Sequence, residues 1–527
     1  MKVVGVTGGK KRYPSFEING MVLDFENGAL VLDFSAEQVS EDKVFYVIGD
    51  GQKNLKAQSA VCGEAWLVKI RIPGRKFLIR ETGISDGMGF RQIEKILQPL
   101  DMDEVILIYP EAEDGSSEGS GNNIQGTAGR NGGQAVPDAW LGAKFALEAA
   151  TNGKNTLLFD DTGMPSVMVR IPCFRWCDVM EGGSEEICSA FIADGKVYDS
   201  IYISKYLNCI RNDRAYSLPG EDPANIIKLD EARAVCAAKG PGWHLMTNAE
   251  WVAVAMWSIK NGTAPHGNTN AGNDALARFE HGVRTYGLPL AGSCRGDHQK
   301  ADYENPGDYP GNPPVGRTRT GISPASWSHD GTDAGIFDLV GNVWDLIAGF
   351  RVMNGEIQVI PDNNSALNVD ESPDSTLWRA VSADGELVMP GTPGTLKFDG
   401  TSPGSDEESL CLVDSGIRIN TEVEFPQYTG AAPKETAECG WSAMPMEMLS
   451  CTDSVRAHRA LAELGILPPK DLAGGGMLFL RSYGERVPSR GASWYDGDLA
   501  SLWSLYLRDN REYCFPDIGF RACWLPV

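Results

Sequence analysis

RGASWYDGDLASLWSLYLRDNREYCFPDIGFR, residues 490–521, is the stretch that decides the fold. Within it, Leu505 and Leu507 alternate with more polar neighbours, which is the period-two pattern of a strand with one buried and one exposed face. The run IGFR at 518–521 alternates in the same way. The sequence therefore predicts two short strands close to the C-terminus.

Aromatic and acidic residues surround these strands in turn-rich sequence that has no periodicity. They are Tyr495, Asp496, Asp498, Asp509, Tyr513, Phe515 and Asp517. One interpretation is a surface turn with some rings tucked inward, since scattered surface apolar residues are normal. The other is a recognition patch, because tyrosine offers a large contact area at low entropy cost and loops on rigid scaffolds carry binding. The pattern alone leaves both open.

The composition limits the kind of partner. A chain of 527 residues is too long for one ordinary core and predicts two or three domains. A formal charge of -24 argues against nucleic acid or an anionic membrane as a partner. The N-terminal sequence lacks a secretory leader pattern, and no run of about 18 apolar residues follows. We therefore expect synthesis in the cytoplasm and no membrane insertion.

The chain divides by composition into three parts. Residues 1–110 predict a β-rich N-terminal domain for attachment or assembly, with hairpin turns at Asn19-Gly20 and Asn27-Gly28 and one helix at 89–97. Residues 111–134 are rich in Gly, Ser and Asn and predict a flexible linker. Residues 135–527 then form the remaining domain.

Residues 228–262 predict two helices joined by a tight connection. Thr247 followed by Glu250 is a capping box, and Asn261-Gly262 is a stop signal. One buried stripe is expected along the second helix, at Val252, Ala255, Met256 and Ile259. These helices are predicted to be scaffold.

Three motifs together carry a family resemblance. WHLMTNAEW at 243–251, GIFDLVGNVWD at 335–345, and RGASW with the terminal IGFR occur in this order. The order resembles the C-type-lectin-like fold shared by formylglycine-generating enzymes and the variable proteins of diversity-generating retroelements. The resemblance covers roughly residues 170–527, interrupted by an insertion at about 362–440. It implies an α+β protein whose C-terminal domain is C-type-lectin-like, with long irregular loops.

The enzymes of this superfamily hold copper with two active-site cysteines. At the positions that match those cysteines, this sequence has Asp496 and Ser501. Without the thiolates there is no soft-ligand pair for Cu(I). The resemblance therefore implies that the protein is not an enzyme and requires no cofactor, with an oxidase of the formylglycine-generating kind as the disfavoured alternative.

The retroelement variable proteins match better, since 490–521 aligns without a gap to their variable region. In that family, mutagenic reverse transcription changes surface residues while scaffold residues persist. The positions that would vary and bind ligand are Tyr495, Asp496, Leu499, Tyr506, Arg508, Asp509, Tyr513, Phe515 and Asp517. We predict that Tyr495, Tyr506, Tyr513 and Phe515 share one solvent-facing patch above a core of Trp494, Leu505, Leu507 and Phe520.

The resemblance also implies a structural calcium ion at the GNVWD segment. The matching positions are Asp338 and Asp345 through their side chains, and Gly341 and Val343 through their carbonyls. Carboxylate oxygens suit a hard cation. The alternative is that the two acids cap turns or pair with an arginine.

These expectations converge on non-enzymatic recognition. The protein is similar to phage or prophage tail receptor-binding proteins, and the resemblance implies host attachment through a host cell-surface protein or glycan. Other tail or virion proteins are expected as further partners, the virion as its location, and a homotrimer as its assembly. A bacterial surface adhesin is the alternative.

Overall fold

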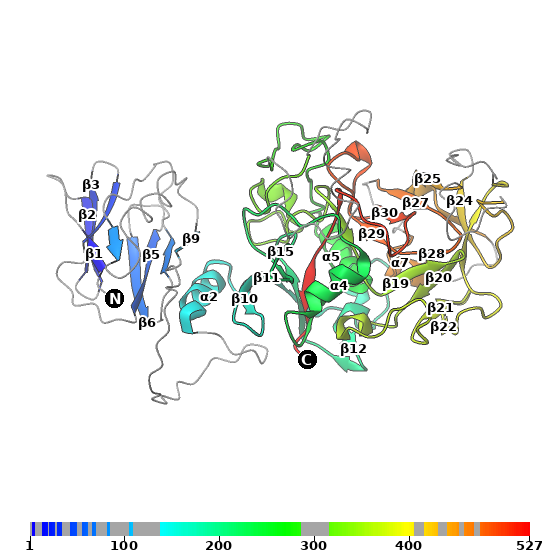
Figure 1. The fold of residues 1–527 in the computed structure, drawn as a ribbon, viewed down its shortest axis with the longest axis horizontal. Coiled ribbons are helices and arrows are strands. Elements are labelled where there is room, and N and C mark those ends of the chain that lie inside the picture. The colour runs from blue at the N-terminus through cyan, green and yellow to red at the C-terminus, as the bar shows by residue number, and fades with distance from the viewer. Residues whose placement is uncertain are drawn as a thin grey trace. The chain divides into compact units, whose positions relative to one another are not determined.

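The computed structural model describes the strands between residues 3 and 108, and residues 138–285, 316–404, 416–429, 440–452, 458–467 and 475–527 (Figure 1). The chain forms two compact units, Met1–Leu157 and Leu158–Val527. Both the linker predicted at 111–134 and the helix predicted at 89–97 lie outside the described residues. A domain boundary at that linker stays a prediction.

The described residues of the first unit form three small sheets and one helix. β2 (Tyr13–Ile18), β3 (Met21–Glu26) and β4 (Ala29–Asp33) form an antiparallel meander. The predicted turn residues Asn19-Gly20 and Asn27-Gly28 lie outside the described residues. The other strands are β1 (Val3–Gly5) with β8 (Thr82–Ile84), and β6 (Leu55–Val61), β5 (Lys43–Gly49), β7 (Trp66–Lys69) and β9 (Val105–Ile108) in that order across a sheet. α2 (Asp138–Ala150) ends before Asn152 and Gly153, which both have positive φ, as a helix stop requires.

A five-stranded sheet brings the C-terminal strand into the middle of the second unit. Its order is β10 (Asn155–Phe159), β11 (Pro165–Pro172), β14 (Ser200–Ser204), β32 (Ala522–Trp524) and β17 (Trp243–Leu245). β32 pairs antiparallel with β14 on one side and β17 on the other. The last residues of the chain therefore hold together segments that are far apart in sequence.

The two predicted helices are α4 (Leu229–Ala237) and α5 (Asn248–Lys260), but the predicted tight connection is wrong, because β17 lies between them. The capping box is present: Thr247 Oγ1 accepts from the Glu250 N–H, and the Thr247 N–H donates to the Glu250 carboxylate. A short apolar run such as β17 cannot be separated from a loop by periodicity.

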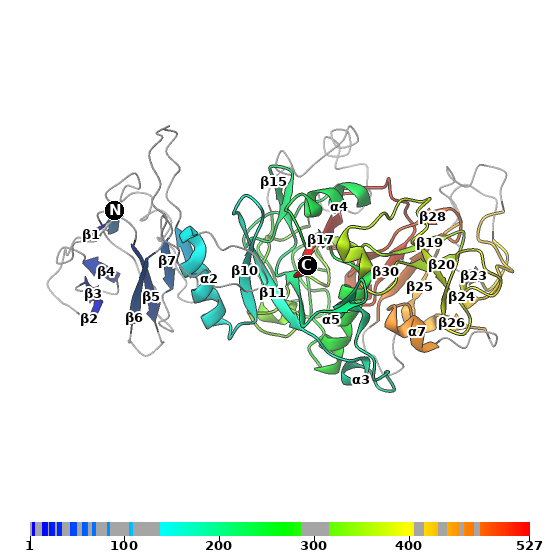
Figure 2. The ribbon, with the colours of Figure 1, turned by 90° about the horizontal axis from the view of Figure 1, so that it is seen from below.

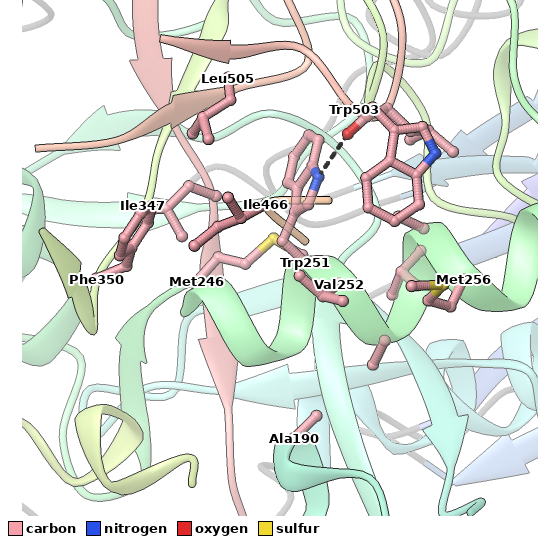
Figure 3. Packing of buried hydrophobic residues seen from close by; sticks show 14 of the residues in the cluster. Ala190, Met246, Trp251, Val252, Met256, Ile347, Phe350, Ile466, Trp503 and Leu505 are labelled. Atoms are coloured by element: carbon pink, nitrogen blue, oxygen red, sulfur yellow. Dashed lines mark hydrogen bonds between the residues drawn. The ribbon is translucent and has the colours of Figure 1, made fainter. Parts of the chain in front are cut away.

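α5 is buried on most sides rather than along one stripe. Val252, Ala255 and Met256 are buried as predicted, Ile259 is only half-buried, and Trp251 is buried as well. Figure 3 shows this helix crossing the main apolar cluster, where Trp251 Nε1 donates to the Leu502 carbonyl at 3.0 Å. A helix enclosed on all sides is the centre of a core.

A six-stranded sheet contains both strands predicted near the C-terminus. Its order is β25 (Ser442–Pro445), β27 (Met477–Leu480), β30 (Leu505–Leu507), β29 (Ser489–Arg490), β18 (Trp344–Leu346) and β31 (Ile518–Phe520). β30 alternates as predicted, with Leu505 and Leu507 buried and Tyr506 half-buried. β31 is the second predicted strand, and its residues and the following Arg521 are all buried.

Four strands of an eight-stranded sheet, those between residues 379 and 420, lie within the predicted insertion at about 362–440. Its strands are β19 (Phe350–Met353), β20 (Glu356–Val359), β21 (Arg379–Val381), β22 (Leu387–Val388), β23 (Lys397–Gly400), β24 (Ile417–Asn420), β26 (Ser450–Cys451) and β28 (Glu485–Arg486). Figures 1 and 2 both show this sheet at the opposite end of the second unit from β10 and β11. The insertion therefore enlarges one end of the unit.

Within the described ranges, the other α-helices and the hairpins of the second unit are short. They are α3 (Trp176–Val179), α7 (His458–Glu463), and the hairpins β12 (Ile192–Ala193) with β13 (Lys196–Val197) and β15 (Cys209–Arg211) with β16 (Arg214–Tyr216). Helices and strands are mixed, as the predicted class requires. Among the described residues, no helix combines the length and apolar composition needed to cross a bilayer.

Candidate functional site

The segment 490–494 is anchored to the GNVWD segment by backbone contacts that only glycine permits. Gly491 has φ +87°, and a Cβ there would lie 2.4 Å from the Leu339 carbonyl oxygen. Gly341 has φ +75°, and its N–H donates to the Gly491 carbonyl at 2.9 Å. These contacts fix where the following residues leave the core.

The apolar residues predicted to lie beneath the display surface are all buried. They are Trp494, Leu505, Leu507 and Phe520. Tyr506 points away from this layer and contacts two further rings, with centroid distances of 5.3 Å to Trp344 and 5.2 Å to Phe479. The Tyr506 ring is therefore packed against other aromatic rings and is not fully exposed to solvent.

The four rings predicted to share one solvent-facing patch, Tyr495, Tyr506, Tyr513 and Phe515, are close together but unequally exposed. Tyr495 is 43% exposed and packs edge-on against Trp494 at 5.7 Å. Tyr513 and Phe515 stack at 5.9 Å and are half-buried, as is Tyr506. Tyr506 interacts electrostatically with both Tyr495 and Tyr513. The rings thus form one set with a single prominent member, Tyr495.

The other predicted ligand-binding residues fall into three classes. Leu499 is exposed, whereas Asp496 and Arg508 are half-buried, and the Arg508 guanidinium lies 4.5 Å from the Trp441 ring centroid. Asp509 and Asp517 are buried, so their predicted place at the exposed surface is wrong. Asp509 lies shortly after β30 and Asp517 directly precedes β31, and polar residues at strand ends are enclosed when neighbouring loops cover them.

Asp517 lies directly beneath Tyr495. The Tyr495 hydroxyl donates to Asp517 Oδ2, while Oδ1 is buried without a hydrogen-bond partner in the part of the chain that the structure describes. Burial raises the pKa of Asp517 to about 7, the Tyr495 hydrogen bond opposes this shift, and the nearby carboxylates of Asp496 and Asp509 add to it. Burial also raises the pKa of Asp496, whose Oδ2 accepts from the Ser493 N–H and Oγ–H at 2.7 Å each.

A second loop adjoins this surface and was missed in the sequence. The Thr269 carbonyl accepts from the Gly497 N–H, and its hydroxyl accepts from the Ala275 N–H, both at 2.9 Å. Beyond it, Leu276 and Phe279 are 78% and 82% exposed. Isolated apolar residues in Gly-rich sequence carry no periodicity, so they offered no signal.

The predicted calcium positions surround an arginine. Arg521 Nη2 lies 3.3 Å from Asp345 Oδ2 and donates to the Asp338 carbonyl oxygen at 3.1 Å. Burial raises the pKa of Asp338 to about 7 and that of Asp345 to about 6, and Arg521 opposes both shifts. Pairing with an arginine is the alternative to calcium at these acids, and the structure contains such an arginine in Arg521.

These residues nonetheless fit a hard cation. Both Asp338 carboxylate oxygens and Asp345 Oδ1 are buried without a hydrogen bond of normal geometry within the described residues. Three such oxygens in one place are the donors that calcium prefers. Gly341 and Val343, the predicted carbonyl ligands, lie between them in sequence, and the side chain of Val343 is buried.

Another buried cluster joins α5 to the C-terminal strand. His244, Glu250 and Cys523 place their ligand-type atoms within 4.8 Å of one another. Glu250 also accepts from the Thr247 N–H at 3.0 Å and from the Asn363 amide at 3.2 Å. Because the Glu250 oxygens already accept several hydrogen bonds, we interpret this cluster as a structural junction.

No family model matches this sequence, and no curated protein matches it.

Proposed function

We propose that the protein is a non-enzymatic recognition protein, similar to phage or prophage tail receptor-binding proteins, with a C-type-lectin-like second unit that displays a diversified surface on residues 490–521. The observation that carries the proposal is that some residues of this segment are buried in the core while their neighbours are exposed. Leu505 and Leu507 are buried in β30, whereas Tyr495 and Leu499 are exposed beside them. Exposed positions on a buried frame can change without loss of the fold.

The chemistry of the segment supports binding rather than catalysis. Its rings are Tyr495, Tyr506, Tyr513 and Phe515, and large rings near the centre of a surface are typical of binding hot spots. At the positions where the related oxidases have cysteines, this chain has Asp496 and Ser501. Incubation with copper and a sulfatase-type cysteine peptide should therefore yield no formylglycine, and conversion would overturn the proposal.

Host attachment requires several copies acting together. We expect a homotrimer in the virion, since weak contacts gain avidity when several sites engage at once. The β-rich first unit would attach to other tail or virion proteins, and the ligand would be a host cell-surface protein or glycan. Light scattering at micromolar protein tests the assembly, and a monomeric mass would contradict the trimer.

The flanking DNA provides the decisive test of the proposed class. A near-copy of the segment that encodes residues 490–521, beside a reverse-transcriptase gene, would support the proposal. In addition, Tyr495→Ala should weaken binding to host cells by on the order of 2 kcal/mol without unfolding the protein. Host binding that is unaffected by Tyr495→Ala and by Leu499→Ala would contradict a display surface at this place.

A further inference from the structure

Asp517 is a buried acid with one unused oxygen. Its side chain is only 5% exposed, and Oδ2 accepts from the Tyr495 hydroxyl. Oδ1 has no hydrogen bond of normal geometry in the described part of the chain, although the backbone N–H of Asp517 itself helps to lower the pKa of the carboxyl group. Burying a carboxylate oxygen in this way is costly, because the oxygen loses water and gains no replacement donor. A ligand group that reaches Oδ1 would recover that lost interaction.

The surroundings of Asp517 concentrate negative charge among aromatic rings. Asp496 and Asp509 both interact electrostatically with Asp517. Tyr495 and Tyr506 interact with it as well, and their rings carry negative charge density on their faces. Acids and ring faces side by side attract an organic cation, through charge pairing and cation–π contact together.

The segment 490–521 contains four arginines, and three of them have partners elsewhere: Arg490 donates to Asn248, Arg511 pairs with Glu485, and Arg521 pairs with Asp345. The fourth is Arg508. The guanidinium of Arg508 packs over Trp441, and its backbone carbonyl accepts hydrogen bonds from Arg481 and Arg486 at 3.2 Å. Asp496, in turn, is held by Ser493. Asp517 therefore differs from Asp496, because one of its oxygens is left for a group from outside.

We propose that Asp517, together with the rings of Tyr495 and Tyr506, receives a cationic nitrogen group of the ligand, and that this group is the ammonium of a lysine or the guanidinium of an arginine on a protein. This inference rests on the proposed function, since it names the ligand chemistry of the same surface. A metal ion prefers several oxygen donors, whereas this site offers the faces of aromatic rings beside the carboxylate. A neutral glycan has no charge to pair with Asp517.

Tyr495 is the group that must move. It is 43% exposed, and its hydroxyl closes over Asp517. Turning the ring outward breaks one hydrogen bond and uncovers both carboxylate oxygens, while the ring stays beside the incoming cation. The Tyr495→Phe variant keeps the ring and removes the competing hydroxyl, so cation binding should survive in it.

Small cationic and neutral probes test the proposed cation site on the full chain. N-acetyl-lysine and N-acetyl-arginine methylamides would be titrated at pH 8 against neutral norleucine and citrulline counterparts, with binding followed by saturation-transfer NMR. We expect millimolar binding of both cations and at least about tenfold weaker binding of the neutral probes. In the Asp517→Asn variant, the cationic probes should bind only as weakly as the neutral probes. Asp498→Asn, a change at an exposed acid of the same segment, should leave binding within about twofold.

Each other result overturns the inference. Equal binding of charged and neutral probes would show that the surface recognises apolar shape, and unchanged cation binding by a folded Asp517→Asn variant would exclude Asp517. Calcium that displaces the cations from the wild type but not from Asp517→Asn would assign the site to a metal ion. If Tyr495→Ala still abolishes host binding in any of these cases, the proposed recognition function stands without this ligand chemistry.

Discussion

Two sets of buried carboxylates differ in what lies opposite them. Asp338 and Asp345 face Arg521, which is itself fully buried. Asp517 instead faces the Tyr495 hydroxyl and shares its surroundings with Asp496 and Asp509. The first set carries its own cation deep in the core, and the second lies under an exposed ring. The comparison teaches that buried acids can be paired with a cation of the chain itself in one place and lie under an exposed ring in another, where we propose that they receive a cation of the ligand.

Arg521→Leu should have the largest effect, because it leaves Asp338 and Asp345 buried without their cation. We expect a loss of about 3–5 kcal/mol in the free energy of unfolding, which is typical when one partner of a buried pair is removed. Urea denaturation at pH 7 measures it. Arg521→Lys keeps the charge and should lose less, whereas equal stability of Arg521→Leu and wild type would show that the pair has no structural role.

Calcium should sharpen the comparison at the same carboxylates. If calcium binds at Asp338 and Asp345, the melting temperature rises from excess EGTA to millimolar calcium, with about 2.7 kcal/mol of stabilisation at a hundredfold excess over Kd. The double change of Asp338 and Asp345 to Ala should abolish the shift, while Asp517→Asn should preserve it. An identical melting temperature in EGTA and calcium would sink the calcium site and leave Arg521 as the sole cation.

Asp517→Asn should stabilise the protein above neutral pH. The folded pKa of Asp517 is raised from 3.8 to about 7, so the folded state holds the proton more tightly and stability falls as pH rises from about 4 to 7. The variant removes this cost. The difference of about 3 between the two pKa values, at about 1.4 kcal/mol per unit, sets an upper bound of about 4 kcal/mol at pH 8. Relaxation around the buried charge lowers this value, so we expect a gain on the order of 2 kcal/mol at pH 8 and none at pH 4. Chemical denaturation at both pH values measures the gain, and a variant that is less stable at pH 8 contradicts it.

Tyr495→Phe should have the smallest effect. It removes the hydroxyl that donates to Asp517 and should cost about 1 kcal/mol at pH 8, where Asp517 is ionised. Because this hydrogen bond lowers the pKa of Asp517, the pH-dependent loss of stability should move to higher pH in the variant. NMR titration of the Asp517 carboxyl carbon measures the change, and an unchanged midpoint would show that the hydrogen bond is absent in solution.

The errors in the predicted site share one origin. Asp509 and Asp517 were placed among the variable surface positions because the sequence around them is polar and rich in turns, yet both are buried. Alternation reports one face of a strand only when the other face meets solvent. β31 is covered on both faces, so its pattern had no bearing on exposure.

Local chemistry by itself determined several features of this protein. The alternation of Leu505 and Leu507, the capping box of Thr247 with Glu250, and the helix stop at Asn261-Gly262 depend on residues within a few positions of each other, so they could be predicted from the sequence. Only the tertiary structure decided the pairing of Arg521 with Asp345, of Tyr495 with Asp517, and of Gly497 with Thr269. Tyr495 and Asp517 lie 22 residues apart in the sequence, and Arg521 and Asp345 lie 176 residues apart. No periodic signal in the sequence spans such distances. The charge and burial of these partners follow from the fold that brings them together.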